Sequence, residues 1–164
     1  MPLELLVEAL IFIFPAYSAN AVPVVFGGGH ALDFGKIFYD NRPILGTHKT
    51  FRGFFVGLII GTLIGFGESF VFTNYDPILG FVLSLGALIG DAVGAFLKRR
   101  LGIPPGALLP IVDQIDFVLG ALLLSFLVKP PTLALASLII IITIPIHLLT
   151  NLLAYLARIK KKPW

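Results

Sequence analysis

The sequence predicts an all-α integral membrane protein with five transmembrane helices. Of its 164 residues, 57% are hydrophobic and only 13% are charged, a composition too apolar for the surface of a soluble domain of this size. Five apolar stretches each approach the roughly 20 residues that cross a hydrocarbon core about 30 Å thick. Eleven of the 12 Lys and Arg residues fall in segments that five spans would place on one side of the membrane. We therefore expect a single membrane-embedded domain over residues 1–164.

The first apolar stretch runs from Leu3 to Val25. Its N-terminal end carries Glu4 and Glu8 but no lysine or arginine, which differs from the basic start of a secretory signal peptide. We therefore expect this helix to be retained.

The second and third stretches, Gly53 to Phe72 and Pro77 to Leu97, carry glycines at four-residue spacing. The two rows are Gly53, Gly57, Gly61 and Gly65, and Gly86, Gly90 and Gly94. Small residues at this spacing let helix backbones approach closely inside a membrane, although glycine is also simply common in membrane helices. The rows predict that these two helices pack against each other at the centre of the protein.

The fourth and fifth stretches run from Ile111 to Val128 and from Leu133 to Ala157. The fourth is only about 18 residues long and carries Asp113 and Asp116 near its start. We expect its first turn to lie at or just inside the membrane interface.

Charge distribution predicts the orientation of the five spans. Segments 27–52, 98–110 and 158–164 hold the 11 basic residues, so the positive-inside rule makes them cytoplasmic, with the N-terminus outside and the C-terminus inside. Anionic lipid headgroups explain the net charge of +3 without a nucleic-acid partner. The tail from Lys160 to Lys162 is expected to anchor the protein at the lipid surface. The 27–52 connection is long for a linker and is therefore a candidate functional loop.

Asp91 is an ionisable residue inside a predicted membrane helix, where a charge is costly unless it faces a polar cavity or a partner. Lys98 follows seven residues later, so the two side chains share one helical face. This face predicts a polar pocket that opens to the cytoplasm. A purely structural Asp91, bonded to a neighbouring helix, remains the alternative.

Asp113 and Asp116 are three residues apart, which places their Cβ atoms about 5–6 Å from each other on a helix. Mg²⁺ binds well to a few carboxylates together with water and phosphate oxygens. Acidic residues also favour the positive end of the helix dipole without binding metal. Because Asp91 and the basic residues nearby are expected at the same end of the bundle, we favour a metal site over simple stabilisation of the helix dipole.

Basic and hydroxyl residues with exposed backbone amides predict phosphate binding. Lys98, Arg99 and Arg100 could hold phosphate oxygens or simply anchor the third helix. The 27–52 loop adds a second group, which is Gly46, Thr47, His48, Lys49, Thr50 and Arg52. This group is not a Walker A loop, because His48 precedes Lys49. Asp33, Lys36, Asp40 and Arg42 either belong to the same site or form a solvated loop face.

Three carboxylates, a divalent metal and many cations, without an evident protein nucleophile, are typical of phosphoryl or nucleotidyl transfer. The chain contains no cysteine, which excludes a Cys nucleophile. Two rivals remain. One is a small transporter with a path along Asp91, Glu68 and a polar stripe at His147, Thr150 and Asn151. The other is a different Mg²⁺-dependent lipid enzyme.

Two segments resemble a known family. The run from Gly90 to Ala121 resembles the signature region of membrane-embedded CTP:lipid-phosphate cytidylyltransferases. The run from Asn20 to Phe54 resembles the archaeal branch, the CDP-archaeol synthases.

The sequence departs from the phosphatidate cytidylyltransferases of bacteria and eukaryotes. The signature's Lys-Arg pair matches Lys98 and Arg99, and its two aspartates match Asp113 and Asp116, but Gln114 replaces the arginine between them. The Lys-Asp and His-Gly-Gly elements are absent. Phosphatidate is therefore the less favoured substrate, and the archaeal branch fits better.

The resemblance implies that CMP is transferred from CTP to an isoprenoid ether-lipid phosphate, giving CDP-archaeol and pyrophosphate at the cytoplasmic face of the cell membrane. From the residues themselves we expect Asp113 and Asp116 to hold Mg²⁺, Asp91 to bind metal or nucleotide, and Lys98 to join these three as a catalytic residue. The implied substrate-binding residues are Asn20, Asp33, Gly46, Lys49, Thr50, Arg52, Lys98 and Arg99.

Overall fold

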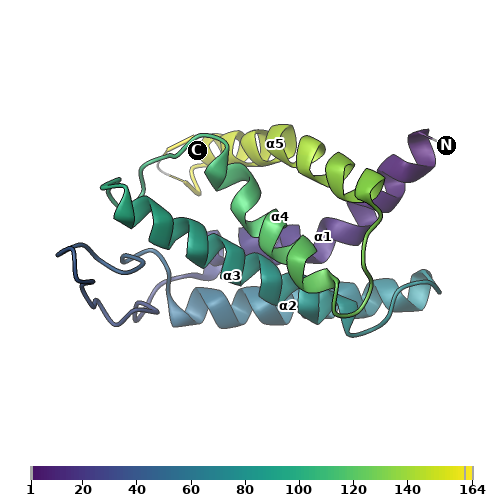
Figure 1. Cartoon of the computed structure of the whole chain (residues 1–164), viewed down its shortest axis with the longest axis horizontal. Helices are drawn as coiled ribbons and strands as arrows, with labels where there is room; N and C mark the ends of the chain where they lie inside the picture. The colour runs from purple at the N-terminus through teal and green to yellow at the C-terminus, as the bar shows by residue number, and fades with distance from the viewer. Residues whose placement is uncertain (1, 161, 164) are drawn as a thin grey trace.

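The computed structural model describes residues 2–160 and 162–163 and forms five helices. Lys161, part of the predicted basic tail, lies outside the described residues. The helices are α1 (Pro2–Phe26), α2 (Phe51–Val71), α3 (Leu79–Arg100), α4 (Val112–Ser125) and α5 (Leu133–Leu156) (Figure 1). The predicted all-α class is confirmed, and all five helices begin and end within three residues of their predicted limits.

Among the described residues, α1, α2, α3 and α5 are long and apolar enough to cross a membrane. The fourth helix is shorter than predicted, with 14 residues, or about 21 Å at 1.5 Å per residue. Its start is delayed because Ile111 adopts a positive φ of 69°, outside helical geometry. At the other end Val128 N and Lys129 N both bond Ser125 O, which turns the chain out of the helix.

The helices form a bundle with its core between α1, α3, α4 and α5. Phe12, Ile13, Leu83, Val118 and Ile139 are almost completely buried there. Large apolar side chains cover the outer surfaces of α2 and α5, including Phe55, Leu63, Phe70, Leu149 and Leu153. Such an apolar exterior is what a lipid solvent favours.

The glycine rows make close helix contacts, and only part of these join the predicted pair, α2 and α3. Gly57 of α2 lies against Ala19 of α1, and Gly65 against Gly80 of α3. The row on α3 faces α4 instead: a Cβ added at Gly86 would lie 2.5 Å from the carbonyl oxygen of Gly120. The predicted packing of α2 against α3 is confirmed, through Gly65 and Gly80, but the glycine row of α3 lies on another face and serves the contact with α4.

The loop over residues 27–50 is held against the C-terminal end of α3. Arg42 Nη1 donates to the carbonyl of Arg100 at 2.6 Å, where the negative end of the helix dipole favours a cation. Arg100 pairs with Asp40 at 2.6 Å, which fixes the far side of the loop. Thr50 then caps α2 by accepting from Gly53 N at 3.1 Å. Lys49 and Thr50 are thereby placed at the junction of the loop and the bundle.

Candidate active site

A cavity of about 1200 Å³ opens at the end of the bundle where the 27–50 loop, the end of α3, the start of α4 and the C-terminal tail meet. The loop and the C-terminus lie at this end, and the N-terminus lies at the other (Figure 1). Eight predicted site residues line the cavity: Asn20, Lys49, Thr50, Asp91, Lys98, Arg99, Asp113 and Asp116.

Two ion pairs join the walls of the cavity. Lys49 Nζ from the loop donates to Asp91 Oδ2 on α3. Lys98 Nζ on α3 lies 2.8 Å from Asp113 Oδ1 on α4 and 3.1 Å from the carbonyl of Ala107. Asp91 and Lys98 both face the cavity, as their shared helical face predicted. These pairs tie three separate elements together around one polar space.

Asp116 occupies space left by glycines. Its carboxylate lies against Gly94 of α3, where any added Cβ would collide with Oδ2. Its backbone carbonyl lies equally close to Gly90. The α3 glycine row thus lets α4 approach until this carboxylate reaches the wall that holds Asp91.

The three aspartates of the cavity are the predicted ligands of Mg²⁺. Asp91, Asp113 and Asp116 line one cavity, but within residues 2–160 and 162–163 no three His, Asp or Glu side chains form a cluster that could hold a metal by themselves. Two of these carboxylates bind lysines instead. Mg²⁺ commonly uses one or two carboxylates and completes its shell with water and substrate phosphates. The residues therefore fit a metal shared with a bound triphosphate, and not a preformed three-carboxylate cage.

Arg99 is 3% exposed although it lines the cavity. Its Nε has no hydrogen-bond partner in the part of the chain that the structure describes. A buried cation without a partner is costly. Arg99 is therefore suited to an anion that enters this cavity.

Three predicted substrate-binding residues do not line the cavity: Asp33, Gly46 and Arg52. Asp33 is 8% exposed and accepts from the amides of Gly35, Leu45 and Gly46 at 2.8–2.9 Å. Burial alone would raise its pKa, but these amides outweigh burial and hold the pKa of Asp33 below its ordinary value. Asp33 therefore organises the loop.

Gly46 contributes backbone geometry rather than a side chain. It adopts a positive φ of 97°, and a Cβ there would lie 3.2 Å from Pro105, so glycine lets the loop approach the 101–111 segment. Arg52 lies exposed on the first turn of α2.

The C-terminal side of the cavity contains residues that the sequence analysis did not assign to the site. Lys160 Nζ donates to Asn151 Oδ1 at 2.8 Å, and Asn151 Nδ2 lies 3.1 Å from His147 Nδ1. Arg158, with a φ of 60°, reverses the chain, and the amides of Ile159 and Lys160 then bond the carbonyl of Ala154. Lys160 therefore lines the cavity, a position that its predicted role as a surface anchor did not include.

Lys160 sits in a partly desolvated, cationic setting. Burial lowers its pKa, and Lys49 and Lys98 act in the same direction against the opposing charge of Asp113. No sequence signal marked this residue, because its position depends on the turn at Arg158.

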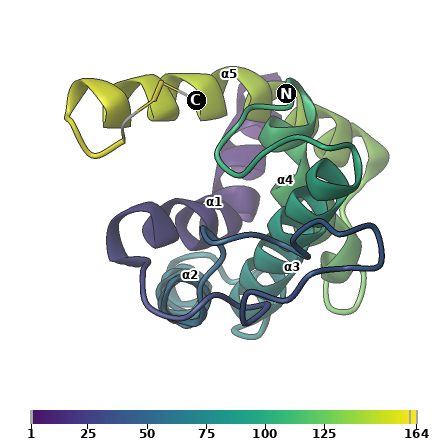
Figure 2. The same ribbon diagram turned by 90° about the vertical axis from the view of Figure 1, so that its left-hand side faces the viewer.

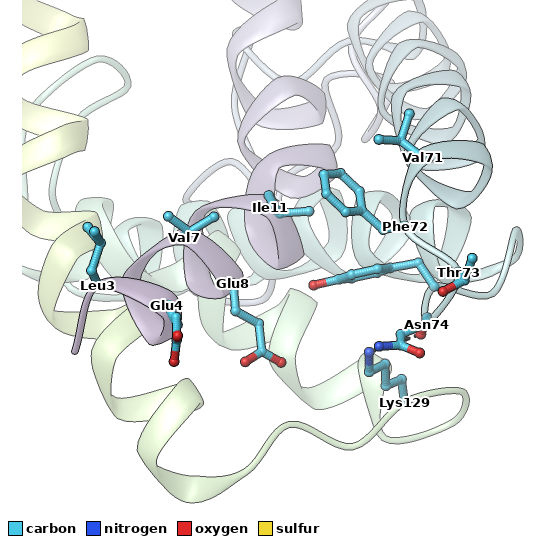
Figure 3. Close-up of a pocket in the computed structure, with 11 residues that line it drawn as sticks. Leu3, Glu4, Val7, Glu8, Ile11, Val71, Phe72, Thr73, Asn74 and Lys129 are labelled. Atoms are coloured by element: carbon cyan, nitrogen blue, oxygen red, sulfur yellow. Dashed lines mark hydrogen bonds between the residues drawn. The ribbon is translucent and has the colours of Figure 1, made fainter. Parts of the chain in front are cut away.

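A smaller cavity of about 580 Å³ lies at the opposite end, between the start of α1, the end of α2 and Lys129 (Figure 3). Lys129 Nζ donates to the carbonyl of Asn74 at 3.0 Å and lies 4.2 Å from the ring centre of Tyr75. Burial, with Glu8 and Glu68, raises the pKa of Tyr75 to about 12. None of the predicted site residues lines this second cavity.

Comparison with known proteins gives the family. A family model described as CarS-like, CDP-archaeol synthase, matches residues 2–164. The CDP-archaeol synthase of Methanopyrus kandleri is 48% identical over 161 residues, which cover 96% of this chain and 92% of the relative. The chain belongs to the CDP-archaeol synthase family. The family member from Pyrococcus horikoshii is 45% identical, with both chains covered completely.

A solved structure gives the same result at the level of the fold. It is described as an intramembrane enzyme for archaeal membrane lipids biosynthesis, and it matches with a TM-score of 0.81 at 39% identity. The match covers 89% of this chain and 94% of that chain. The predicted family and enzyme class, a nucleotidyltransferase of archaeal membrane lipid synthesis, are confirmed. The transporter alternative is therefore set aside.

Proposed function

We propose that the large cavity is the active site in which CMP passes from CTP to 2,3-bis-O-geranylgeranyl-sn-glycerol 1-phosphate, an isoprenoid ether-lipid phosphate. The observation that carries this proposal is the convergence of Asp91, Asp113 and Asp116 with Lys49, Lys98 and Arg99 around one cavity. The cavity also has an apolar wall, formed by α1 and α5 residues such as Leu10, Phe14, Val24 and Ile146. A polar floor beside an apolar wall suits one anionic nucleotide and one lipid.

In the proposed reaction, an oxygen of the lipid phosphate attacks the α-phosphorus of CTP. A new P–O bond forms, the bond between the α-phosphorus and the bridging oxygen breaks, and pyrophosphate leaves with that electron pair. The second pKa of a phosphate monoester is about 6, so the acceptor is already largely ionised at neutral pH. The residues need not supply a strong base, and their main task is to reduce repulsion between two anions.

The cationic residues are proposed to perform that task. Lys49 and Lys98 each pair with a carboxylate of the cavity, and a bound triphosphate would give them phosphate oxygens as alternative partners. Arg99 is proposed to bind a phosphate through its guanidinium group, whose Nε has no hydrogen-bond partner among the described residues. Asp113 and Asp116, with Asp91, would hold Mg²⁺ as the lysines turn to the nucleotide. The bound metal would supply charge neutralisation on the phosphates and on the departing pyrophosphate.

The proposed orientation follows the positive-inside rule, with the cavity facing the cytoplasm, the N-terminus outside and α4 as a short fifth crossing. Contacts at the two ends support α4 as a crossing. Lys129, which follows α4, reaches Asn74 at the end opposite to the cavity, whereas Lys98 binds Asp113 at the cavity end.

The test is formation of CDP-lipid by purified protein in detergent from CTP labelled at the α-phosphate. The ether-lipid phosphate and phosphatidate are offered separately, with and without Mg²⁺. We expect Mg²⁺-dependent product with the ether lipid, and at least a 100-fold loss in Asp113→Asn and Asp116→Asn, since removing a group that stabilises transferring charge costs about 10²–10³ in rate.

Asp76→Asn serves as the matched control, because Asp76 lies exposed in the α2–α3 connection at the other end of the molecule. It should retain wild-type turnover. Near-wild-type turnover in a folded Asp113→Asn or Asp116→Asn protein would remove that residue from the proposed site.

A further inference from the structure

The cavity has two cationic sides with different surroundings. Lys49, Lys98 and Arg99 lie on the side of the loop and α3, among residues predicted to bind the nucleotide. Lys160 lies on the α5 side, where the lining residues are the polar His147, Thr150 and Asn151 and the apolar Ile146, Ala154 and Ile159. The second side therefore combines a positive charge and polar groups with an apolar surface.

Lys160 also differs from the other two lysines in its bonding. Lys49 and Lys98 are each neutralised by a carboxylate. Within the described residues Lys160 forms no ion pair, and the partner of its Nζ is the neutral amide oxygen of Asn151 at 2.8 Å. An ammonium group has three N–H donors, so Asn151 orients the side chain and leaves donors for another acceptor.

The partial burial of Lys160 indicates an anion as that acceptor. Removing an ammonium from water is unfavourable unless an opposite charge compensates it. Asp113 attracts this ammonium group while those of Lys49 and Lys98 repel it, and a dianionic phosphate between the walls would add further attraction. Because an apolar wall borders Lys160, the phosphate best suited to this position carries hydrocarbon chains.

We propose that Lys160, oriented by Asn151, binds the phosphate of the acceptor lipid, while its chains lie along the apolar wall between α1 and α5. In Figure 2 the C-terminal half of α5 projects beyond the rest of the bundle, beside α1. The α1 residues Leu10 and Phe14 and the α5 residue Ile146 line the same cavity as Lys160. The two substrates thus approach from opposite sides, CTP over the loop and α3, and lipid over α5. This inference rests on the proposed function and adds a separate site for the acceptor.

The experiment compares Lys160→Gln, Lys160→Arg and Lys36→Gln in the detergent assay with CTP, Mg²⁺ and the ether-lipid phosphate. Lys36→Gln is the matched control, since it makes the same exchange of lysine for glutamine at an exposed position of the 27–50 loop that does not line the cavity. The measured quantities are KM for the lipid, KM for CTP, and the Kd of CTP in the absence of lipid.

We expect Lys160→Gln to raise KM for the lipid about 10-fold or more, as loss of a charge-assisted hydrogen bond implies, with the Kd of CTP within about twofold of wild type. Lys160→Arg should recover most of the lipid affinity, and Lys36→Gln should leave all three constants unchanged. An unchanged lipid KM in Lys160→Gln, or an equal loss of CTP affinity, would overturn the assignment. A wild-type protein that binds CTP but forms no CDP-lipid would instead overturn the proposed function, and the acceptor site with it.

Discussion

At the scale of single residues, two lysines of the cavity are neutralised by two aspartates. The pairs Lys49–Asp91 and Lys98–Asp113 each bring one acid and one base from different elements together. A half-buried charge is tolerated when a partner compensates it. A metal–triphosphate complex would bind these same groups, with the phosphates taking the lysines and the metal taking the aspartates. Substrate binding would therefore give each buried charge a new partner and would leave none of them unpaired.

A residue-scale prediction concerns the second cavity. The hydroxyl of Tyr75 is buried and has no hydrogen-bond partner among the described residues, while its ring lies 6.0 Å from that of Phe72 and 6.3 Å from that of Phe12. Tyr75→Phe removes the unsatisfied hydroxyl, whose burial costs about 1–3 kcal/mol, and keeps the ring contacts. We expect an unchanged or higher Tm in detergent.

Tyr75→Ala is the companion variant, and it should lower the free energy of unfolding by about 3–5 kcal/mol, as is typical for loss of a large core side chain. A marked drop in Tm for Tyr75→Phe would mean that the hydroxyl bonds an acceptor or water in the folded protein.

The residues that sequence reasoning identified share one property, which is charge or polarity within an apolar context. Asp91 and Asp116 stand out because membrane helices exclude such residues without a reason. Asp33 was predicted to bind substrate for the same reason, but its carboxylate accepts hydrogen bonds from backbone amides of its own loop. No local sequence pattern distinguishes an aspartate that binds substrate from one that stabilises a loop. Lys160 was missed because its place in the cavity depends on the backbone turn at Arg158.

At the scale of elements, apolar runs located the helices well but did not define their ends or partners. Ile111 is as apolar as the helix it precedes, yet its positive φ stops α4 there. The glycine rows predicted close approach correctly, because small residues remove the steric barrier. They could not specify which helix approaches, since the choice of partner depends on how all five helices pack together.

The contact between α3 and α4 leads to a prediction at this scale. A Cβ at Gly86 would lie 2.5 Å from the Gly120 carbonyl oxygen and 2.8 Å from Ala121 Cα, both backbone atoms that cannot move without shifting α4. Gly86→Ala should therefore lower the free energy of unfolding by about 1–3 kcal/mol, the usual cost of overpacking, and should reduce turnover by displacing Asp116. Thermal unfolding and CDP-lipid formation measure the two effects.

Gly67→Ala is the control, because a Cβ at this α2 position meets nothing within 4 Å. The alanine has higher helix propensity, so Tm should stay the same or rise slightly. Equal stability of the two alanine variants would contradict the tight α3–α4 contact.

At the scale of the whole molecule, the two ends differ in chemistry. One end holds the large charged cavity and the basic loop and tail, and the other holds the N-terminus and the smaller cavity. This polarity agrees with the charge asymmetry of the sequence, which is the basis of the proposed orientation.

The orientation can be measured with single cysteines, since the chain has none of its own. Tyr39→Cys, Thr73→Cys and Arg158→Cys place a thiol at exposed positions in the loop, in the α2–α3 connection and in the tail. With a membrane-impermeant maleimide, we expect positions 39 and 158 to react only from the cytoplasmic side and position 73 only from outside.

Labelling of 158 together with 73 would show that α4 does not complete a crossing. Labelling of 39 from outside would reverse the orientation.

The shortness of α4 has a consequence for the surrounding lipid. Leu119 and Leu123 of this helix are exposed on the outside of the bundle, yet the helix is about 9 Å shorter than a hydrocarbon core of about 30 Å. Acyl or isoprenoid chains beside it would have to compress or tilt to match, because hydrophobic mismatch is relieved by local thinning. The bilayer around the enzyme would then be locally thinned, and the lipid headgroups beside α4 would lie closer to the membrane depth at which the phosphates react.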